Sequence, residues 1–166
     1  RDGILFSEEE SYPTHLIKPE NTPIKALCLH VSHDCNLRCR YCFAQTGDFG
    51  TVRSLMRPET AKKAIDFVIE NSSTRRNIEI DFFGGEPLMA WDTVKETVEY
   101  ANKQAEKHNK FFRFTLTTNG VLLNDENIAY INEKMSNVVL SLDGRKAVND
   151  SMRKTVSGTG SYDIIL

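Results

Sequence analysis

The feature that most constrains the fold is a repeated alternation of strand-like and helix-like segments, which begins near Ile24. Short apolar runs suited to buried strands alternate with longer stretches in which apolar residues recur at helical spacing. Repeated strand–helix units imply a parallel sheet with right-handed crossovers, so the predicted fold class is α/β. The predicted strands are 26–31, 78–83, 112–117 and 138–142, and the predicted helices begin at Pro58, at Asp92 or Thr93, after the capping residue Asn124, and at Tyr162. The first predicted helix repeats Ala61, Ala64, Ile65, Val68 and Ile69 at helical spacing. The second is expected to carry Val94, Val98, Ala101 and Ala105 on its inner face, and the third bears Ile128, Ile131 and Met135.

The most distinctive short motifs all lie at the ends of the predicted strands. Three cysteines follow the first strand, Gly-Gly-Glu-Pro (84–87) follows the second, Thr-Asn-Gly (118–120) follows the third, and Ser-Leu-Asp-Gly (141–144) overlaps the fourth. Clustering at the carboxyl ends of parallel strands is typical of the active face of a (β/α) barrel. An open doubly wound sheet also binds ligands there, but its Gly-x-Gly-x-x-Gly sequence is missing after the first strand. The pattern therefore favours a barrel.

Composition limits the class of protein further. Hydrophobic residues make up 40% of the 166 residues and charged residues 27%, which allows a packed core. The net charge of −2 gives no electrostatic footprint for nucleic acid or an anionic membrane, and no apolar run approaches the ~20 residues of a membrane helix. Residues 1–23, with an acidic run at 8–10 and three prolines, are predicted to be a linker or lead-in. Because the chain begins at Arg1 without an initiator Met, we expect that it is processed or excerpted.

Cysteine usage indicates a metal centre. Cys35, Cys39 and Cys42 fall within eight residues, and thiols this crowded are typical of metal ligands in a reducing compartment, which predicts a cytoplasmic protein. Structural zinc and [4Fe–4S] sites both normally take four protein ligands. Three close thiolates without an obvious fourth therefore suggest an iron–sulfur cluster with one iron left open. Cys28 is expected to pack in the core, as buried free cysteines often do, but Cys28 and His33 remain alternative ligands.

The sequence Cys-Asn-Leu-Arg-Cys-Arg-Tyr-Cys at 35–42 resembles the cluster motif of the radical S-adenosylmethionine (SAM, also written AdoMet) enzymes. The three motifs at the later strand ends occur in the order that this family uses, and the resemblance covers residues 24–166. It implies a partial (β/α)6 radical SAM barrel holding about the first four βα units. Residues 24–166 would then be the N-terminal part of the barrel, with the later strands and a SPASM-type domain outside this chain.

The resemblance also implies the chemistry and a set of site residues. The open iron would chelate SAM, and one electron from the cluster would cleave SAM to a 5′-deoxyadenosyl radical that abstracts a hydrogen atom. The implied cluster ligands are Cys35, Cys39 and Cys42. For SAM, the resemblance places Tyr41 beside the adenine, Gly84, Gly85 and Glu86 at the amino group, and Arg153 at the carboxylate. Ser141, on a buried strand, would contact the ribose, and Asn119 is a further implied SAM-binding residue.

Each of these residues also has a structural interpretation. Gly84 and Gly85 could simply turn the chain, Tyr41 could be a packing residue, Asn119 could be a left-handed turn residue, and Arg153 could be a surface charge. Asp143, directly before Gly144, is interpreted as a turn former and is not assigned to the site.

The residues flanking the motifs look like the SPASM or twitch branch of peptide-modifying enzymes, and most resemble the SCIFF peptide maturases. That resemblance implies a maturase of ribosomally made peptides (a sactipeptide-type RiPP enzyme) that forms a Cys-to-Thr thioether in a cysteine-rich precursor, with a separate electron donor. Two alternatives stay open: an anaerobic sulfatase maturase that oxidises Cys or Ser, and a non-enzymatic zinc-binding module that uses His33 with the three cysteines of the loop.

Overall fold

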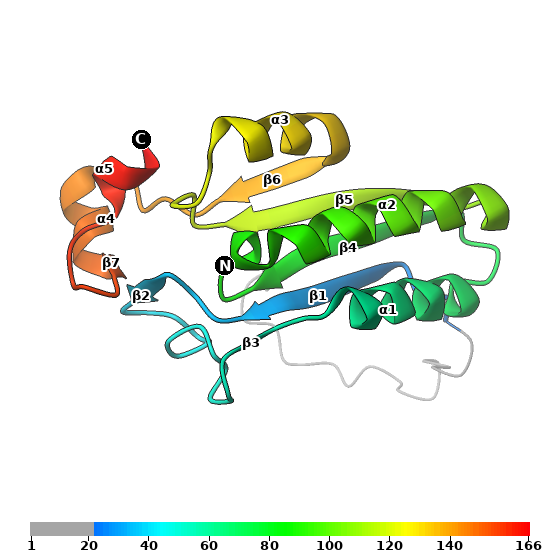
Figure 1. The fold of residues 1–166 in the computed structure, drawn as a ribbon, viewed down its shortest axis with the longest axis horizontal. Helices are drawn as coiled ribbons and strands as arrows, with labels where there is room; N and C mark the ends of the chain where they lie inside the picture. Colours follow the sequence, from blue (N-terminus) through cyan, green and yellow to red (C-terminus); the bar gives the residue numbers. More distant parts are fainter. Residues whose placement is uncertain (1–21) are drawn as a thin grey trace, which may run out of the picture.

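A five-stranded sheet forms the centre of the computed structural model, which describes residues 22–166 (Figure 1). The sheet order is β3-β1-β4-β5-β6, in which β1, β4, β5 and β6 run parallel and β3 pairs antiparallel with β1. The strands are β1 Ala26–His33, β3 Ser54–Leu55, β4 Asn77–Gly84, β5 Phe111–Thr118 and β6 Asn137–Leu140. A second, two-stranded antiparallel sheet joins β2 (Leu37–Cys39) to β7 (Arg153–Thr155). The predicted lead-in, apart from its last two residues, lies outside the described residues.

The connecting helices follow the predicted order. The four predicted helices correspond to α1 Pro58–Asn71, α2 Trp91–His108, α3 Asp125–Lys134 and α5 Tyr162–Ile165. Helix α4 (Lys146–Met152) and a 3₁₀ helix, η3 (Pro87–Ala90), were not predicted. Pro58 occupies the first turn of α1, and Asn124 caps α3 through a reciprocal capping box with Asn127, as the sequence predicts. The parallel βαβαβαβ order is therefore confirmed.

The capping prediction for the second helix is wrong. Glu86 caps η3 by accepting a hydrogen bond from Leu88 N, and α2 continues directly from η3 at Trp91. Thr93 then lies inside the helix, where its hydroxyl donates to the Met56 carbonyl at 2.8 Å. Because the chain is already helical before Asp92, no cap is needed there.

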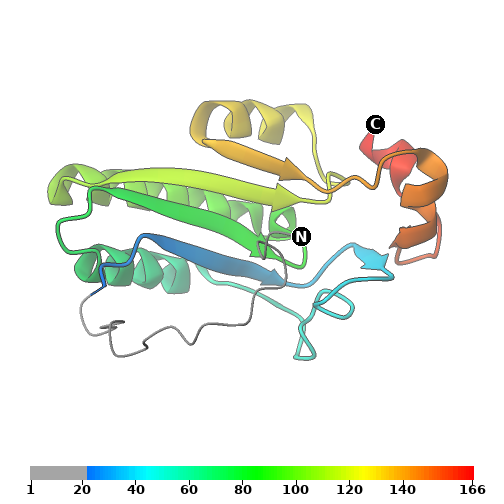
Figure 2. The same cartoon turned by 180° about the vertical axis from the view of Figure 1, so that it is seen from behind.

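Helices α1 and α2 cover one face of the sheet, as the two opposite views show (Figures 1 and 2). Alternate strand residues on that face pack against the apolar faces of the two helices and form the core. The buried strand residues include Leu29, Val31, Ile80, Phe82, Phe114 and Leu116, and the buried helix residues include Ile65, Val68, Val94 and Val98. Of the two isoleucines of α3, Ile131 is buried, whereas Ile128 is 41% exposed.

Cys28 is exposed, so the prediction that it packs in the core is wrong. Strand residues alternate between faces, and Cys28 falls on the face that carries no helix, between the buried Leu29 and the half-buried Leu27. Its register partners on that face are polar: Cys28 pairs with Asp81, which pairs with Thr115. One residue of register decides which face a strand side chain occupies.

Strand β6 is shorter and more exposed than predicted. It ends at Leu140 rather than at residue 142, and all four of its residues are exposed. Ser141 therefore lies just past the strand rather than within a buried one, although its N–H still donates to the Thr118 carbonyl at 2.9 Å. Within residues 22–166, β6 is one of the two outer strands of the sheet, and β3 is the other.

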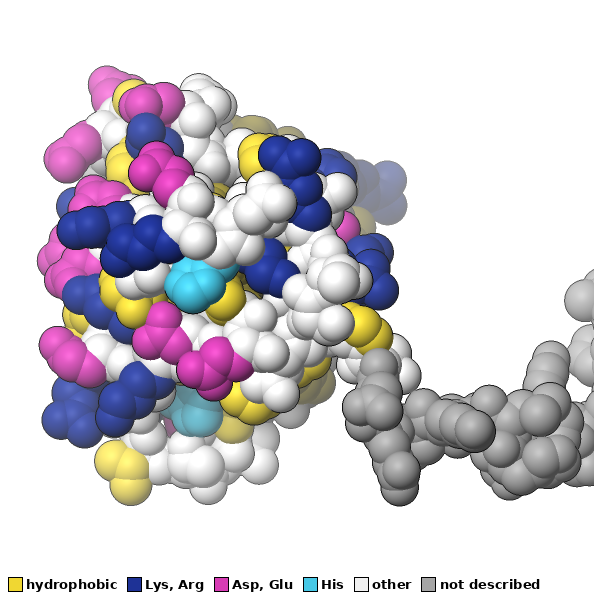
Figure 3. All heavy atoms as spheres, turned by 90° about the vertical axis from the view of Figure 1, so that its right-hand side faces the viewer, with side chains coloured by type: hydrophobic (Ala, Val, Ile, Leu, Met, Phe, Trp, Pro, Cys, Tyr) yellow, Lys and Arg dark blue, Asp and Glu magenta, His cyan; other side chains and the backbone are white. Residues whose placement is uncertain are grey.

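The amino ends of the strands carry charges of both signs, which Figure 3 shows from that end of the molecule. A pocket of about 470 Å³ at this end is lined by Lys25, Arg75, Arg76, Asn77, Glu79, Phe111 and Arg113. The cysteine loop lies at the opposite ends of the same strands (Figure 1). Among the described helices, none combines the length and the apolar character that a bilayer crossing requires.

Candidate active site

The three clustered cysteines lie in and around the short strand β2. Cys35 precedes β2, and Cys39 is the last residue of β2. Cys42 follows in a turn in which its own N–H donates to the Cys39 carbonyl at 3.2 Å. All three are partly buried free thiols. Strand β2 is held by β7, with Cys39 directly opposite Arg153, and the Arg40 N–H donates to the Met152 carbonyl at 2.9 Å. The loop thus presents three unpaired thiols from a fixed backbone.

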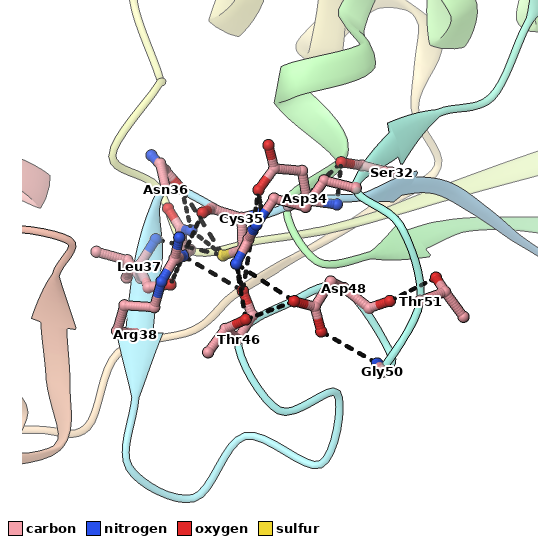
Figure 4. Close-up of polar contacts among 12 residues, drawn as sticks. Ser32, Asp34, Cys35, Asn36, Leu37, Arg38, Thr46, Asp48, Gly50 and Thr51 are labelled. Carbon is pink, nitrogen blue, oxygen red and sulfur yellow. Dashed lines mark hydrogen bonds and ion pairs between the residues drawn. The ribbon is translucent and has the colours of Figure 1, made fainter.

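Cys35 is the most constrained of the three (Figure 4). Its N–H donates to Asp34 Oδ1 at 2.8 Å, and the Leu37 N–H donates to its sulfur at 3.4 Å. Arg38 Nη1 donates to the carbonyls of Cys35 and Leu37 at 2.6 and 2.7 Å. Burial raises the pKa of the Cys35 thiol to about 11, against the opposing effect of the Leu37 N–H. Such a thiol ionises at neutral pH when a metal cation binds it.

Gly47 packs directly against Cys35. It adopts a left-handed φ of +89°, and a Cβ at this position would lie 2.3 Å from Cys35 Cβ. Gly158 has nearly the same φ of +85°, with open space where its Cβ would be. The two glycines therefore share backbone strain but differ in crowding.

We expect Gly47→Ala to destabilise the protein by about 1–3 kcal/mol more than Gly158→Ala, because only Gly47→Ala adds a steric clash to the left-handed strain. Urea unfolding of the two variants measures this difference, and iron content after reconstitution reports whether the cysteine loop keeps its shape. Equal unfolding free energies would show that the loop yields at Gly47 without cost.

Gly84 and Gly85 allow the end of β4 to contact the backbone that leads into the cysteine loop. A Cβ on Gly84 would lie 2.3 Å from the Ser32 carbonyl oxygen, and one on Gly85 would lie 2.2 Å from that of Asp34. The N–H groups of Gly85 and Glu86 donate to the same two carbonyls at 2.8 and 2.9 Å. The glycines are thus required by this close approach and do more than turn the chain.

Glu86 joins the ends of β4 and β5 through a fully buried carboxylate. Its Oε1 accepts from Leu88 N at 3.0 Å and from the Thr118 hydroxyl at 2.7 Å, and its Oε2 accepts from Asn119 N at 2.8 Å. Burial raises the pKa of Glu86, and the three donors oppose that rise. Sequence reasoning did not find this structural link.

Asn119 reaches the cysteine loop. Its Oδ1 accepts from Val121 N at 3.0 Å, and this contact directs its Nδ2 to Asn36 Oδ1 at 2.8 Å and toward Cys35 Sγ at 3.7 Å. The left-handed residue of the turn is Gly120, with φ +82°, so the interpretation of Asn119 as a left-handed turn residue is wrong. Asn36, which the sequence analysis missed, also has a buried Nδ2 without a hydrogen-bond partner among the described residues.

Asp143 joins Tyr41 and Arg153. The Tyr41 hydroxyl donates to both carboxylate oxygens of Asp143, at 2.9 and 2.7 Å. Arg153 Nε donates to Asp143 Oδ1 at 2.9 Å, and the guanidinium lies 5.3 Å from the centre of the Tyr41 ring. Burial and the hydrogen bond to Asp143 raise the pKa of Tyr41 to about 12. Asp143 is therefore more than a turn former, and Arg153 is a partly buried ion-pair residue rather than a free surface charge.

The contacts of His33 are with residues other than the three cysteines of the loop. Its Nδ1 is 3.3 Å from the Thr51 hydroxyl, and its ring packs 4.8 Å from that of Phe49. Across residues 22–166, no three His, Cys, Asp or Glu side chains are placed to share one metal ion. The four-ligand zinc set with His33 is therefore not assembled in this structure, whereas three free thiols on one short loop suit the separate corners of an iron–sulfur cluster.

The comparison with known families decides the identity of this arrangement. The sequence profile of the Radical SAM superfamily matches residues 29–166. The chain belongs to the radical SAM superfamily. Enzymes of this superfamily use a [4Fe–4S] cluster and SAM, and the donor set of the cysteine loop fits such a cluster. The expected family and its cofactors are thus confirmed.

Individual relatives are similar over most of this radical SAM chain. The radical SAM cyclopropyl synthase TigE of Paramaledivibacter caminithermalis is 31% identical over 172 residues, covering 93% of this chain and 35% of the relative. The cysteine-type anaerobic sulfatase-maturating enzyme of Clostridium novyi is 28% identical over 143 residues, covering 81% and 36%. The solved structure of native anSMEcpe with bound AdoMet and Cp18Cys peptide superposes with a TM-score of 0.73 at 27% identity, covering 86% of this chain and 38% of that one. The chain therefore spans little more than a third of the length of these relatives.

Proposed function

We propose that this radical SAM chain belongs to a peptide maturase that forms a Cys-to-Thr thioether crosslink in a ribosomally made, cysteine-rich precursor. The observation that carries the proposal is the meeting of the cysteine loop, the Gly84–Gly85 turn and Asn119 at the carboxyl ends of β1, β4 and β5. The resemblance of the motifs to SCIFF maturases supports the reaction. The solved peptide complex of a relative supports a peptide as partner.

In this proposal Cys35, Cys39 and Cys42 hold the cluster. When bound, the cluster supplies the single electron that cleaves SAM to the 5′-deoxyadenosyl radical, and an external electron donor must provide that electron. The chain's own residues bind and orient SAM so that the radical forms next to the substrate, since the difficult chemistry belongs to the cofactors. The crowded thiols favour a reducing compartment, so the proposed location is the cytoplasm.

The proposed SAM contacts are distributed over the strand ends. Backbone groups of Gly84 and Gly85 address the amino group, Tyr41 lies beside the adenine, and Ser141 contacts the ribose. Glu86 acts on the amino group through this turn and not by direct contact, because its carboxylate is fully buried and both of its oxygens accept hydrogen bonds from this chain. Asn119 contributes its amide, and Arg153 addresses the carboxylate through its terminal nitrogens, because its Nε is engaged by Asp143. We further propose that residues 24–166 form the N-terminal part of a (β/α)6 barrel, preceded by a lead-in at 1–23 and completed by strands and a SPASM-type domain beyond this segment.

We expect Ser141→Ala to weaken SAM binding about 5- to 150-fold, which corresponds to the roughly 1–3 kcal/mol of a lost buried hydrogen bond. Ser136→Ala is the matched control, because Ser136 directly precedes β6 and Ser141 directly follows it. The Ser136 N–H donates to β5 at 2.8 Å, and the Ser141 N–H donates to β5 at 2.9 Å. Calorimetric titration of SAM into the reconstituted variants measures the effect. Equal affinities for the two variants would remove Ser141 from the site.

The reaction is tested by incubating the whole enzyme that contains this segment, after reconstitution, with SAM, a reductant and a cysteine-rich peptide encoded beside its gene; the segment alone is expected to leave the peptide unmodified. Thioether formation predicts 5′-deoxyadenosine together with a peptide that has lost two hydrogen atoms and one free thiol. The similarity to the Clostridium novyi sulfatase-maturating enzyme supports a second candidate, oxidation of a Cys or Ser side chain. In that case the product gains an aldehyde and contains no crosslink.

A further inference from the structure

A partly buried ion pair lies directly beside the middle cysteine of the loop. In the β2–β7 ladder Cys39 and Arg153 are register partners, so their backbones are adjacent. Arg153 Nε donates to Asp143 Oδ1 at 2.9 Å, and the side chains of the pair are only 13% and 21% exposed. Two opposite charges are therefore held near one sulfur with little water to screen them.

The pair is held in place from several sides. The Tyr41 hydroxyl donates to both oxygens of Asp143, and the Asp143 N–H donates to Oδ1 of Asn149, which is fully buried. The Arg153 guanidinium lies over the Tyr41 ring at 5.3 Å. The carboxylate thus fixes the guanidinium in position against β2, and neither group is a free surface charge.

The two charges act on the Cys39 sulfur in opposite directions. Arg153, which lies opposite Cys39 in the ladder, carries a positive charge, and Asp143, which accepts a hydrogen bond from Arg153 Nε, carries a negative one. A cation that stabilises a thiolate also stabilises the extra negative charge of a reduced cluster bound to that thiolate. Hydrogen bonds and charges at cluster sulfurs are among the determinants of cluster potential.

We infer that Arg153 and Asp143 set the reduction potential of the bound cluster through Cys39, with Asp143 acting as the residue that positions the Arg153 guanidinium. This inference rests on the proposed role of Cys39 as a cluster ligand. The inferred effect on the potential is separate from the SAM carboxylate contact proposed for Arg153, because the potential is that of the cluster before SAM binds. It predicts potential shifts of opposite sign for the two members of the pair.

The test is a redox titration of the reconstituted protein without SAM, followed by the electron paramagnetic resonance signal of the reduced cluster. Arg153→Gln removes the cation, so the midpoint potential should fall, whereas Asp143→Asn leaves the cation unbalanced, so it should rise. We expect each change to alter the ratio of reduced to oxidised cluster about tenfold at a fixed potential, or about 59 mV for one electron. Tyr41→Phe changes no charge and should shift the potential much less.

A matched control is the Lys62–Glu96 ion pair, which is 2.7 Å long and joins α1 to α2. Lys62→Gln and Glu96→Gln make the same charge changes and should leave the potential unaltered. Shifts of equal size in the control, shifts of the same sign in Arg153→Gln and Asp143→Asn, or no shift in either would overturn the inference. Loss of iron from both Arg153→Gln and Asp143→Asn would also overturn it, since the pair would then serve only to shape the loop.

Iron and sulfide content separates this inference from the proposed function on which it rests. Loss of the cluster from Cys39→Ala, together with no opposite shifts, would overturn the inference alone. Full cluster content in Cys39→Ala would overturn the ligand assignment and the inference with it.

Discussion

Replacing any one of Cys35, Cys39 or Cys42 with alanine should abolish stable cluster assembly, and with it SAM cleavage. The three thiols come from one loop whose backbone is held by β7 and by the close contact of Gly47 with Cys35. Two remaining thiolates cannot hold the cube and still leave one iron open for SAM. Iron and acid-labile sulfide analysis after anaerobic reconstitution measures the loss, and assay of 5′-deoxyadenosine confirms its consequence.

Cys28→Ala is the matched control. Cys28 is exposed on the sheet face opposite the helices, so its replacement should retain the cluster and change the unfolding free energy by less than about 0.5 kcal/mol. This cost is smaller than the sequence analysis implied, because Cys28 lies outside the core formed by residues 22–166. Equal iron loss in all four alanine variants would mean that the assignment of the ligands is wrong.

Glu86→Ala should produce the largest loss of stability among single substitutions near the site. It would leave three donors, Leu88 N, the Thr118 hydroxyl and Asn119 N, without their acceptor in a fully buried environment. Each unsatisfied buried donor costs about 1–3 kcal/mol, so a total of about 3 kcal/mol or more is expected. Urea unfolding measures this cost, and SAM titration on the folded fraction measures the accompanying loss of affinity.

Glu70→Ala is the control for Glu86→Ala, because it also removes a carboxylate, but from an exposed position near the end of α1. Glu86→Gln keeps one acceptor but turns an amide N–H₂ toward a donor, so it should fall between Glu86→Ala and the unaltered protein. A Glu86→Ala protein as stable as the Glu70→Ala protein would show that the ends of β4 and β5 are held together by other contacts.

The long elements of the fold could be predicted because their periodicity is local. The helix stripe of α1 and the apolar runs of β1, β4 and β5 lie close to where the sequence places them. Short elements could not be predicted in the same way. Strands β2, β3 and β7 have two or three residues each, and helix α4 has seven, so they are too short for a periodic signal and depend on tertiary contacts.

The site was predictable as a set of motifs but not as a network of contacts. The residues that the sequence analysis missed, Asp143 and Asn36, act through partners far along the chain: Tyr41 lies 102 residues from Asp143, and Asn119 lies 83 residues from Asn36. No single-sequence pattern reports such distances. The face of Cys28 was also mispredicted, because an apolar run does not specify which of its alternating residues faces the helices.

The pairing of β2 with β7 has a consequence for how the protein matures. It closes a loop that spans all the intervening strand–helix units, since Leu37 pairs with Thr155. Contacts so distant in sequence carry a large loop-closure entropy and form late in folding. While the chain is being synthesised, the cysteine loop emerges long before the strand that holds it. We therefore expect the loop to take its final shape around the three thiols only after Thr155 has been synthesised, well after Cys42.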